Sequence, residues 1–154
     1  MKISIVALFA SALLVVRPVD ARDSGTCQIV VPTDFAAVPS RWLGACSGGR
    51  AEGLGVLRAG AMEPYRFFAG QARAGRPVKG LIVIKDGFYT ADSFDAHGTR
   101  RDITSGDPTE FHALYVLAAR AALATAQRFA AAGNRGSAAY YRRLAKQIHD
   151  GEPE

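Results

Sequence analysis

The chain has 154 residues, a formal net charge of +5 and 49% hydrophobic residues. This length suits a single domain with a sizeable core. Its Lys and Arg residues lack the dense clustering of nucleic-acid binders, so no nucleic-acid partner is expected and the charge indicates ordinary solubility.

The N-terminus has the layout of a secretory signal peptide. Lys2 provides the positive start, residues 3–16 are apolar, and Val19 and Ala21 satisfy the small-residue rule for cleavage. The apolar stretch is shorter than the roughly 20 residues that cross a bilayer as a helix, which disfavours the alternative of a retained membrane anchor. We therefore expect a signal peptide over residues 1–21, cleaved after Ala21. The mature domain, residues 22–154, is then secreted or periplasmic and has no integral membrane segment.

Only two cysteines, Cys27 and Cys46, occur in the chain. In an oxidising compartment an isolated pair most simply forms a disulfide. Such a bond would close a loop of about 20 residues and contribute roughly 3 kcal/mol in the chain-entropy model. The alternative, a reactive thiol at Cys46, needs a positioned base, and the sequence places no histidine near it.

The segment that follows predicts a β-hairpin with Gly48 and Gly49 as a two-residue turn, because glycine readily adopts the positive φ of primed turns. The Trp42 indole would then cover a surface opened by glycines. The register that this turn sets pairs Cys46 with Ala51, Gly44 with Gly53, and Trp42 with Gly55.

Further strands follow the same logic. Residues 27–31 are predicted as a strand, and residues 81–84 are apolar at both parities, which indicates a strand covered on both faces. Asp86 and Gly87 predict a second primed turn that pairs Ile84 with Tyr89. We expect about six strands between residues 27 and 95, arranged as an antiparallel meander.

An aromatic-x-glycine start occurs as Trp42-x-Gly44 and again as Phe68-x-Gly70, and Phe94 follows at the same spacing with Ala96 in place of the glycine. Residues 42–98 resemble a MORN-type repeat, a family of glycine-punctuated hairpins. The first unit adds Gly53-x-Gly55, whereas the second has Gly75 and a single glycine, Gly80, at the corresponding place. The resemblance implies a scaffold or contact surface for proteins or lipids, and it brings no catalytic residue.

Helical patterns begin after residue 105. Asp107 is predicted as an N-cap, with Pro108 at the first helical position and Glu110 closing a capping box. An apolar stripe then recurs at helical spacing, formed by Phe111, Leu114, Ala118, Ala122, Thr125 and Phe129.

Gly133 and Asn134 end this helix, and Ser137 is predicted to cap a second helix that runs to about His149. Its apolar face comprises Tyr141, Leu144, Ala145 and Ile148. A helical hairpin over residues 107–149 would pack on the sheet of residues 27–98, which defines an α+β fold. The alternative, a tetratricopeptide-like unit, lacks the second copy that a solenoid needs.

The sequence contains no recognisable metal-binding or hydrolase motif. His97, His112 and His149 have no metal-ligand spacing, and Ser47 does not lie in a hydrolase elbow. We expect no catalytic residue, no metal and no cofactor. The possible contacts with an anionic partner are basic: Arg100, Arg101, Arg142, Arg143 and Lys146. The alternative for these residues is the solvated face that any amphipathic helix carries.

These features predict an exported, non-enzymatic binding or scaffold module that acts in the bacterial periplasm or envelope through protein or surface contacts. One alternative is a small envelope hydrolase whose site forms only in three dimensions. Another is a periplasmic immunity or inhibitor protein, which this size and export signal would permit.

Overall fold

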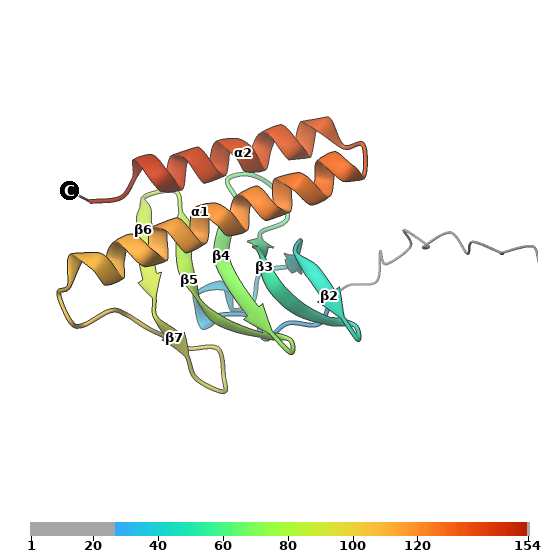
Figure 1. Ribbon diagram of the computed structural model, residues 1–154. Coiled ribbons are helices and arrows are strands. Elements are labelled where there is room, and N and C mark those ends of the chain that lie inside the picture. Colours follow the sequence, from blue (N-terminus) through green and yellow to red (C-terminus); the bar gives the residue numbers. More distant parts are fainter. Residues whose placement is uncertain (1–26, 154) are drawn as a thin grey trace, which may run out of the picture.

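The computed structural model describes residues 27–153, and it confirms the α+β fold of an antiparallel sheet followed by a helical hairpin (Figure 1). The predicted signal peptide and its cleavage after Ala21 lie outside the described residues. Within residues 27–153, none of the helices combines the length and the apolar character that a membrane span requires.

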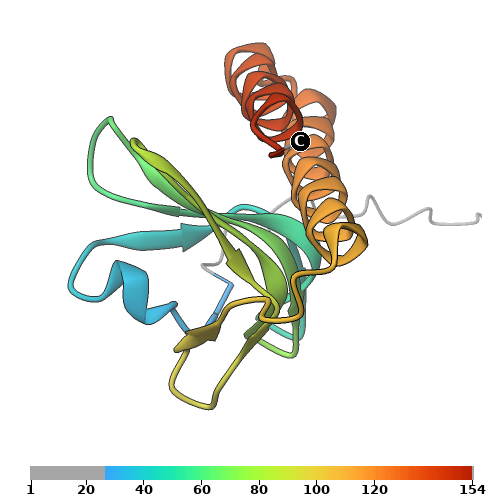
Figure 2. The ribbon, with the colours of Figure 1, turned by 90° about the vertical axis from the view of Figure 1, so that its left-hand side faces the viewer.

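Six strands form the main sheet, in the order β1-β3-β4-β5-β6 with β2 paired to β3. Its strands are β1 Ser40–Trp42, β2 Ala45–Ser47, β3 Arg50–Ala59, β4 Arg66–Arg73, β5 Arg76–Ile84 and β6 Gly87–Ala91. The smaller elements are a 3-10 turn, η1, at Thr33–Phe35, and a two-stranded sheet of β7 Ser93–Phe94 and β8 Arg100–Arg101. The helices are α1 Pro108–Ala131 and α2 Arg135–Asp150. Figure 2 shows both helices on one side of the sheet and η1 on the other.

A hydrophobic core lies on each face of the sheet. On the helix face, Leu81 and Val83 belong to the cluster that packs against α1 and α2. On the opposite face, Ile82 and Ile84 belong to a cluster with Phe35 of η1. The prediction that residues 81–84 are covered on both sides is therefore confirmed.

A row of glycines crosses the sheet. Gly55 pairs with Gly70, and Gly70 pairs with Gly80. A Cβ added at Gly55 would lie 2.5 Å from the Cα of Gly44, which extends the row to the segment between β1 and β2. The glycines leave room for two aromatic rings: Trp42 lies over the first two glycines of the row, and Phe68 over the last two. The predicted covering of glycines by the Trp42 indole is confirmed.

The hairpin register was predicted correctly near its turn and wrongly further out. Cys46 pairs with Ala51, as expected. Trp42, however, pairs with Leu57, and the glycine beside Gly55 is Gly44. The cause is an irregular segment that separates β1 from β2 opposite Gly53, whose φ of 76° departs from strand geometry. A register counted from the turn alone cannot include this irregularity.

The second predicted turn is displaced. Ile84 pairs with Gly87, residues 85–86 form the turn, and Tyr89 pairs with Ile82. The prediction that Ile84 pairs with Tyr89 is thus wrong, because Gly87 begins the strand instead of completing the turn. Paired residues share a face of the sheet, so Tyr89 still lies on the face of Ile82 and Ile84.

Residues 27–31 do not form the predicted strand. They contribute a single parallel bridge, between Gln28 and Arg50. The Gln28 N–H donates to Gly49 O at 2.8 Å and the Val30 N–H to Gly75 O at 2.8 Å. The segment therefore runs across the ends of two hairpins, where the carbonyls of their turns accept its hydrogen bonds.

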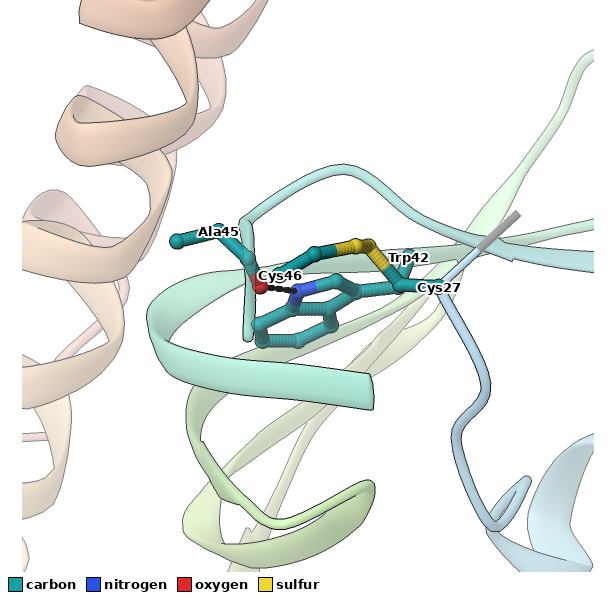
Figure 3. Close-up of a disulfide and its surroundings, with 4 residues drawn as sticks. All are labelled: Cys27, Trp42, Ala45 and Cys46. Atoms are coloured by element: carbon teal, nitrogen blue, oxygen red, sulfur yellow. Dashed lines mark hydrogen bonds between the residues drawn. A yellow bond between two sulfur atoms is a disulfide. The ribbon is translucent and has the colours of Figure 1, made fainter. Parts of the chain in front are cut away.

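The predicted disulfide joins Cys27 to Cys46, with Cα atoms 5.8 Å apart. It ties the first described residue to β2 and lies beside the Trp42 indole (Figure 3). The indole Nε1–H donates to Ala45 O at 2.9 Å, so the polar edge of this buried ring is satisfied.

Both helix starts differ in part from their predictions. Asp107 caps α1 by accepting from the Thr109 N–H at 2.8 Å, as expected. Glu110 does not close a capping box, because it accepts from Ser105 Oγ, and Ser105 Oγ accepts the Asp107 N–H at 3.2 Å. The cap of α2 is Asn134, which accepts from the Ser137 N–H at 3.0 Å, so α2 starts before the predicted cap at Ser137.

The predicted apolar faces of the helices are buried except for Phe111 and Phe129, which are partly exposed. One polar residue of these faces, Thr125, ties α1 to the sheet. Thr125 Oγ1 accepts the Val56 N–H at 3.1 Å and donates to Ala121 O at 3.1 Å. The neighbouring Val56 carbonyl accepts from the Leu43 N–H, at the junction between β1 and β2. A side chain of α1 therefore satisfies a buried strand donor at the point where the edge of the sheet is irregular.

Candidate functional site

One end of the sheet carries two cavities, one on each face. This hairpin end comprises the β3–β4 loop, residues 60–65, and the β5–β6 turn, residues 85–86; Figure 2 shows the two turns side by side. Pro64, Ile84 and Lys85 line both cavities. The same end exposes Met62, whose side chain is 76% exposed.

The first cavity, which we name the sheet cavity, has a volume of about 510 Å³ and lies on the face opposite the helices. Its apolar floor consists of Ile82, Ile84 and Tyr89, because Tyr89 pairs with Ile82 across β5 and β6. Ile82 is fully buried, whereas the ring of Tyr89 is 44% exposed. The charged groups around this floor are Asp34, Arg66, Lys85, Asp86 and Arg100.

Arg100 is held in place by several partners. Its Nε donates to Asp34 Oδ1 at 3.0 Å, its Nη1 donates to the Thr90 carbonyl at 3.0 Å, and it also pairs with Asp102. Its guanidinium carbon lies 5.3 Å from the ring centroid of Tyr89. Two carboxylates thus balance its charge, and its guanidinium lies near the tyrosine ring at cation-π distance.

Arg66 and Lys85 differ from Arg100 in this respect. Among residues 27–153, neither side chain takes part in an ion pair. Arg66 begins β4 and Lys85 follows β5, and both residues are exposed. The sheet cavity therefore combines an apolar floor with two cationic side chains at its rim.

The second cavity, the tyrosine cavity, has a volume of about 640 Å³ and lies on the helix face. Its aromatic lining is Tyr65, Phe67 and Tyr140, with the polar residues Glu63 and Gln147. The guanidinium of Arg58 lies 4.6 Å from the Tyr65 ring centroid, so a cation of the protein already occupies this cluster.

Burial raises the pKa of two tyrosines of α2 near this cavity, Tyr140 and Tyr141. It is the largest cause that raises the pKa of Tyr141 to about 12. Burial, followed by the negative charge of Glu63, also raises the pKa of Tyr140. Tyr140 and Tyr141 both contact Phe67, at ring-centroid distances of 6.2 and 6.3 Å. These neutral rings pack α2 against the sheet, and their role is structural.

The structure separates the five basic residues predicted as anionic-partner contacts. Arg100 lines the sheet cavity, and Arg101 is exposed next to it in β8. Arg142, Arg143 and Lys146 are exposed on α2, the helix that packs on α1 on the other side of the sheet. Lys146 pairs with Asp150 on the same helix. The predicted residues therefore do not form one continuous surface.

The histidines are also apart from one another. His112 Nδ1 lies 2.8 Å from Glu152 Oε1, and the His97 N–H donates to Asp95 Oδ1 within a loop. No group of three metal-ligating side chains occurs among residues 27–153. Ser47 pairs with Arg50 at the β2–β3 turn, which is the turn role that its sequence context indicates.

Sequence reasoning did not identify Arg66, Lys85 and Tyr89 as site residues. They come from β4, the β5–β6 turn and β6, and only strand pairing brings them together. A usable signal was present in β6, where Phe88 and Tyr89 are adjacent and so point to opposite faces. One of the two rings had to lie on the face away from the helices.

Comparison of the chain with protein-family models, with curated proteins and with solved structures finds no match.

Proposed function

We propose that this chain is an exported binding module of the bacterial periplasm or envelope, which holds a protein partner through the sheet cavity. The observation that carries the proposal is the composition of that cavity, which combines an apolar floor and an exposed tyrosine with the cations Arg66 and Lys85. Its volume is in the range of ligand-binding clefts. Tyrosine and arginine are also the residue types that dominate the energetics of protein interfaces.

Export is part of the proposal. The signal peptide of residues 1–21 would direct the chain out of the cytoplasm, with cleavage after Ala21. The Cys27–Cys46 disulfide supports this location, because disulfides persist mainly in oxidising compartments.

We further propose that residues 42–98 form a MORN-like scaffold. The support is geometric: Trp42 and Phe68 each begin an aromatic-x-glycine unit, and each ring lies over the glycine two residues further along the chain and over one glycine of a neighbouring strand. Two units of the same design, side by side, would produce a stiff sheet that presents the hairpin end to a partner.

A capture experiment on periplasmic extract tests the binding function. The bait is the mature chain, residues 22–154, as wild type, as the double variant Arg66→Gln/Lys85→Gln, and as the matched control Arg142→Gln/Arg143→Gln. Both variants remove two exposed positive charges, so they have the same net charge. We expect a stoichiometric partner on the wild type and on the α2 variant, and its loss from the cavity variant. Equal capture by all three baits, loss from the α2 variant alone, or no partner at all would each contradict the proposal.

A further inference from the structure

The charges around the sheet cavity are unevenly compensated. Of its three cations, Arg100 is paired with Asp34 and Asp102. Arg66 and Lys85 form no ion pair among residues 27–153, and both line the cavity although they belong to different elements. The remaining carboxylate of the lining, Asp86, is exposed in the turn beside Lys85.

This arrangement favours an anionic group at the rim. Arg66 and Lys85 attract it, Arg100 contributes little net charge, and Asp86 opposes it. Neutralising Lys85 should therefore lower the affinity for a negatively charged group. Neutralising its neighbour Asp86 should raise that affinity.

The floor of the cavity adds an apolar requirement. Tyr89 is 44% exposed and lies near the guanidinium of Arg100, while Ile82 is 1% exposed and closes the floor. A closed floor on a sheet surface offers no channel for a long acyl chain. It does offer contact area to one compact aromatic or branched aliphatic side chain, which would cover the tyrosine ring.

We infer that the sheet cavity binds an acidic peptide segment in which a carboxylate side chain neighbours an aromatic or branched aliphatic one. This inference rests on the proposed binding function and names the chemistry of the partner. The carboxylate contacts Arg66 and Lys85, and the apolar side chain lies on Ile84 and Tyr89.

Calorimetric titration of the mature chain with blocked tetrapeptides tests the inference. The probe has the order leucine, phenylalanine, glutamate, glutamate; in two control peptides both glutamates are replaced by glutamine or by lysine. We expect the glutamate peptide to bind at least about 5-fold more tightly than the glutamine peptide, and the lysine peptide to bind least. Raising the salt concentration should weaken the binding of the glutamate peptide more than that of the other two peptides. Equal binding of the three peptides would overturn the inference.

Single variants assign the binding to the cavity. Arg66→Gln and Lys85→Gln should each lower the affinity for the glutamate peptide by about 2- to 5-fold, and Asp86→Asn should raise it by a similar factor. Arg142→Gln on α2 should leave the affinity unchanged. Variants that merely damage the fold would all weaken binding, so the opposite sign for Asp86→Asn separates charge recognition from instability. Weaker binding by Asp86→Asn, or an equal loss with Arg142→Gln, would overturn the inference.

Three further outcomes decide how this inference stands relative to the proposed function. If capture from periplasmic extract depends on Arg66 and Lys85 but the glutamate peptide gains nothing over the glutamine peptide, the partner is not an acidic peptide and the binding function stands. If vesicles containing phosphatidylglycerol bind through Arg66 and Lys85 while the peptides do not, the occupant is a lipid surface, and both the peptide inference and the proposal of a protein partner fail. If neither peptide binding nor capture depends on these residues, both proposals fail.

Discussion

Gly70→Ala is expected to lower the free energy of unfolding by about 3 kcal/mol or more, near the upper end of single-residue effects. A Cβ at Gly70 would lie 2.3 Å from Lys79 O and 2.8 Å from Gly80 Cα, both backbone atoms of β5. It would also meet Phe68 Cζ at 2.8 Å. A rotamer change of Phe68 relieves only the last contact, so the strands themselves must separate.

The matched control is Gly87→Ala. Gly87 is also a strand glycine, a Cβ added there meets nothing within 4 Å, and its φ is not positive. Its effect should stay within about 0.5 kcal/mol, whereas Gly70→Ala should lower the Tm by roughly 10 °C. Thermal and urea unfolding followed by far-UV circular dichroism measures both. Equal Tm values for the two variants would mean that the glycine row does not set the spacing of the strands.

Trp42→Ala is expected to cost about 3–5 kcal/mol, the range for truncation of a large buried aromatic side chain. The indole is 4% exposed and lies over Gly44 and Gly55, where a Cβ would meet its Cζ2 at 2.5 and 2.7 Å. Because these glycines have no side chains, no neighbouring group on that side can fill the space that the ring leaves.

Trp42→Phe is the informative comparison. It keeps an aromatic ring over the glycines but removes the Nε1–H that donates to Ala45 O. We expect it to lower the free energy of unfolding clearly less than Trp42→Ala, by about 1–3 kcal/mol, since it leaves a smaller void and removes one hydrogen bond. Trp42 is the single tryptophan of the chain, so circular dichroism rather than fluorescence must follow the unfolding. A loss below 1 kcal/mol for Trp42→Ala would show that the ring is dispensable.

Much of the architecture is encoded locally, and those parts were predictable. The Gly48 and Gly49 turn, the pairing of Cys46 with Ala51 and the disulfide to Cys27 follow from turn chemistry and cysteine count. The buried faces of both helices follow from apolar periodicity. In each case the pattern and its structural consequence lie within a few residues of one another or depend on a single pair.

The errors share a physical origin in irregular backbone. The register of Trp42 failed because the segment between β1 and β2 breaks the ladder opposite Gly53. The second turn was misplaced because residues 85–86, which lack a glycine, form it and Gly87 begins β6. The turn propensity of the residues indicates roughly where a turn or an irregular segment occurs. Its exact position depends on packing across the whole sheet.

The candidate site was largely hidden from sequence reasoning. Of the basic residues predicted to contact an anionic partner, Arg100 lines the sheet cavity, where it is already paired with Asp34. The two cations that we expect to act on a ligand, Arg66 and Lys85, have no motif around them. Their importance comes from the absence of ion pairs to either side chain within residues 27–153 and from the exposed Tyr89 in the same cavity, and both features arise only from tertiary structure.

Amide chemical-shift mapping of the labelled mature chain, titrated with the captured partner, tests most directly whether binding occurs at the hairpin end. The largest perturbations should fall on residues 65–66, 82–89 and 100, around the sheet cavity. Perturbations that instead cluster on residues 142–146 of α2 would contradict the proposal and place the partner on the helical surface.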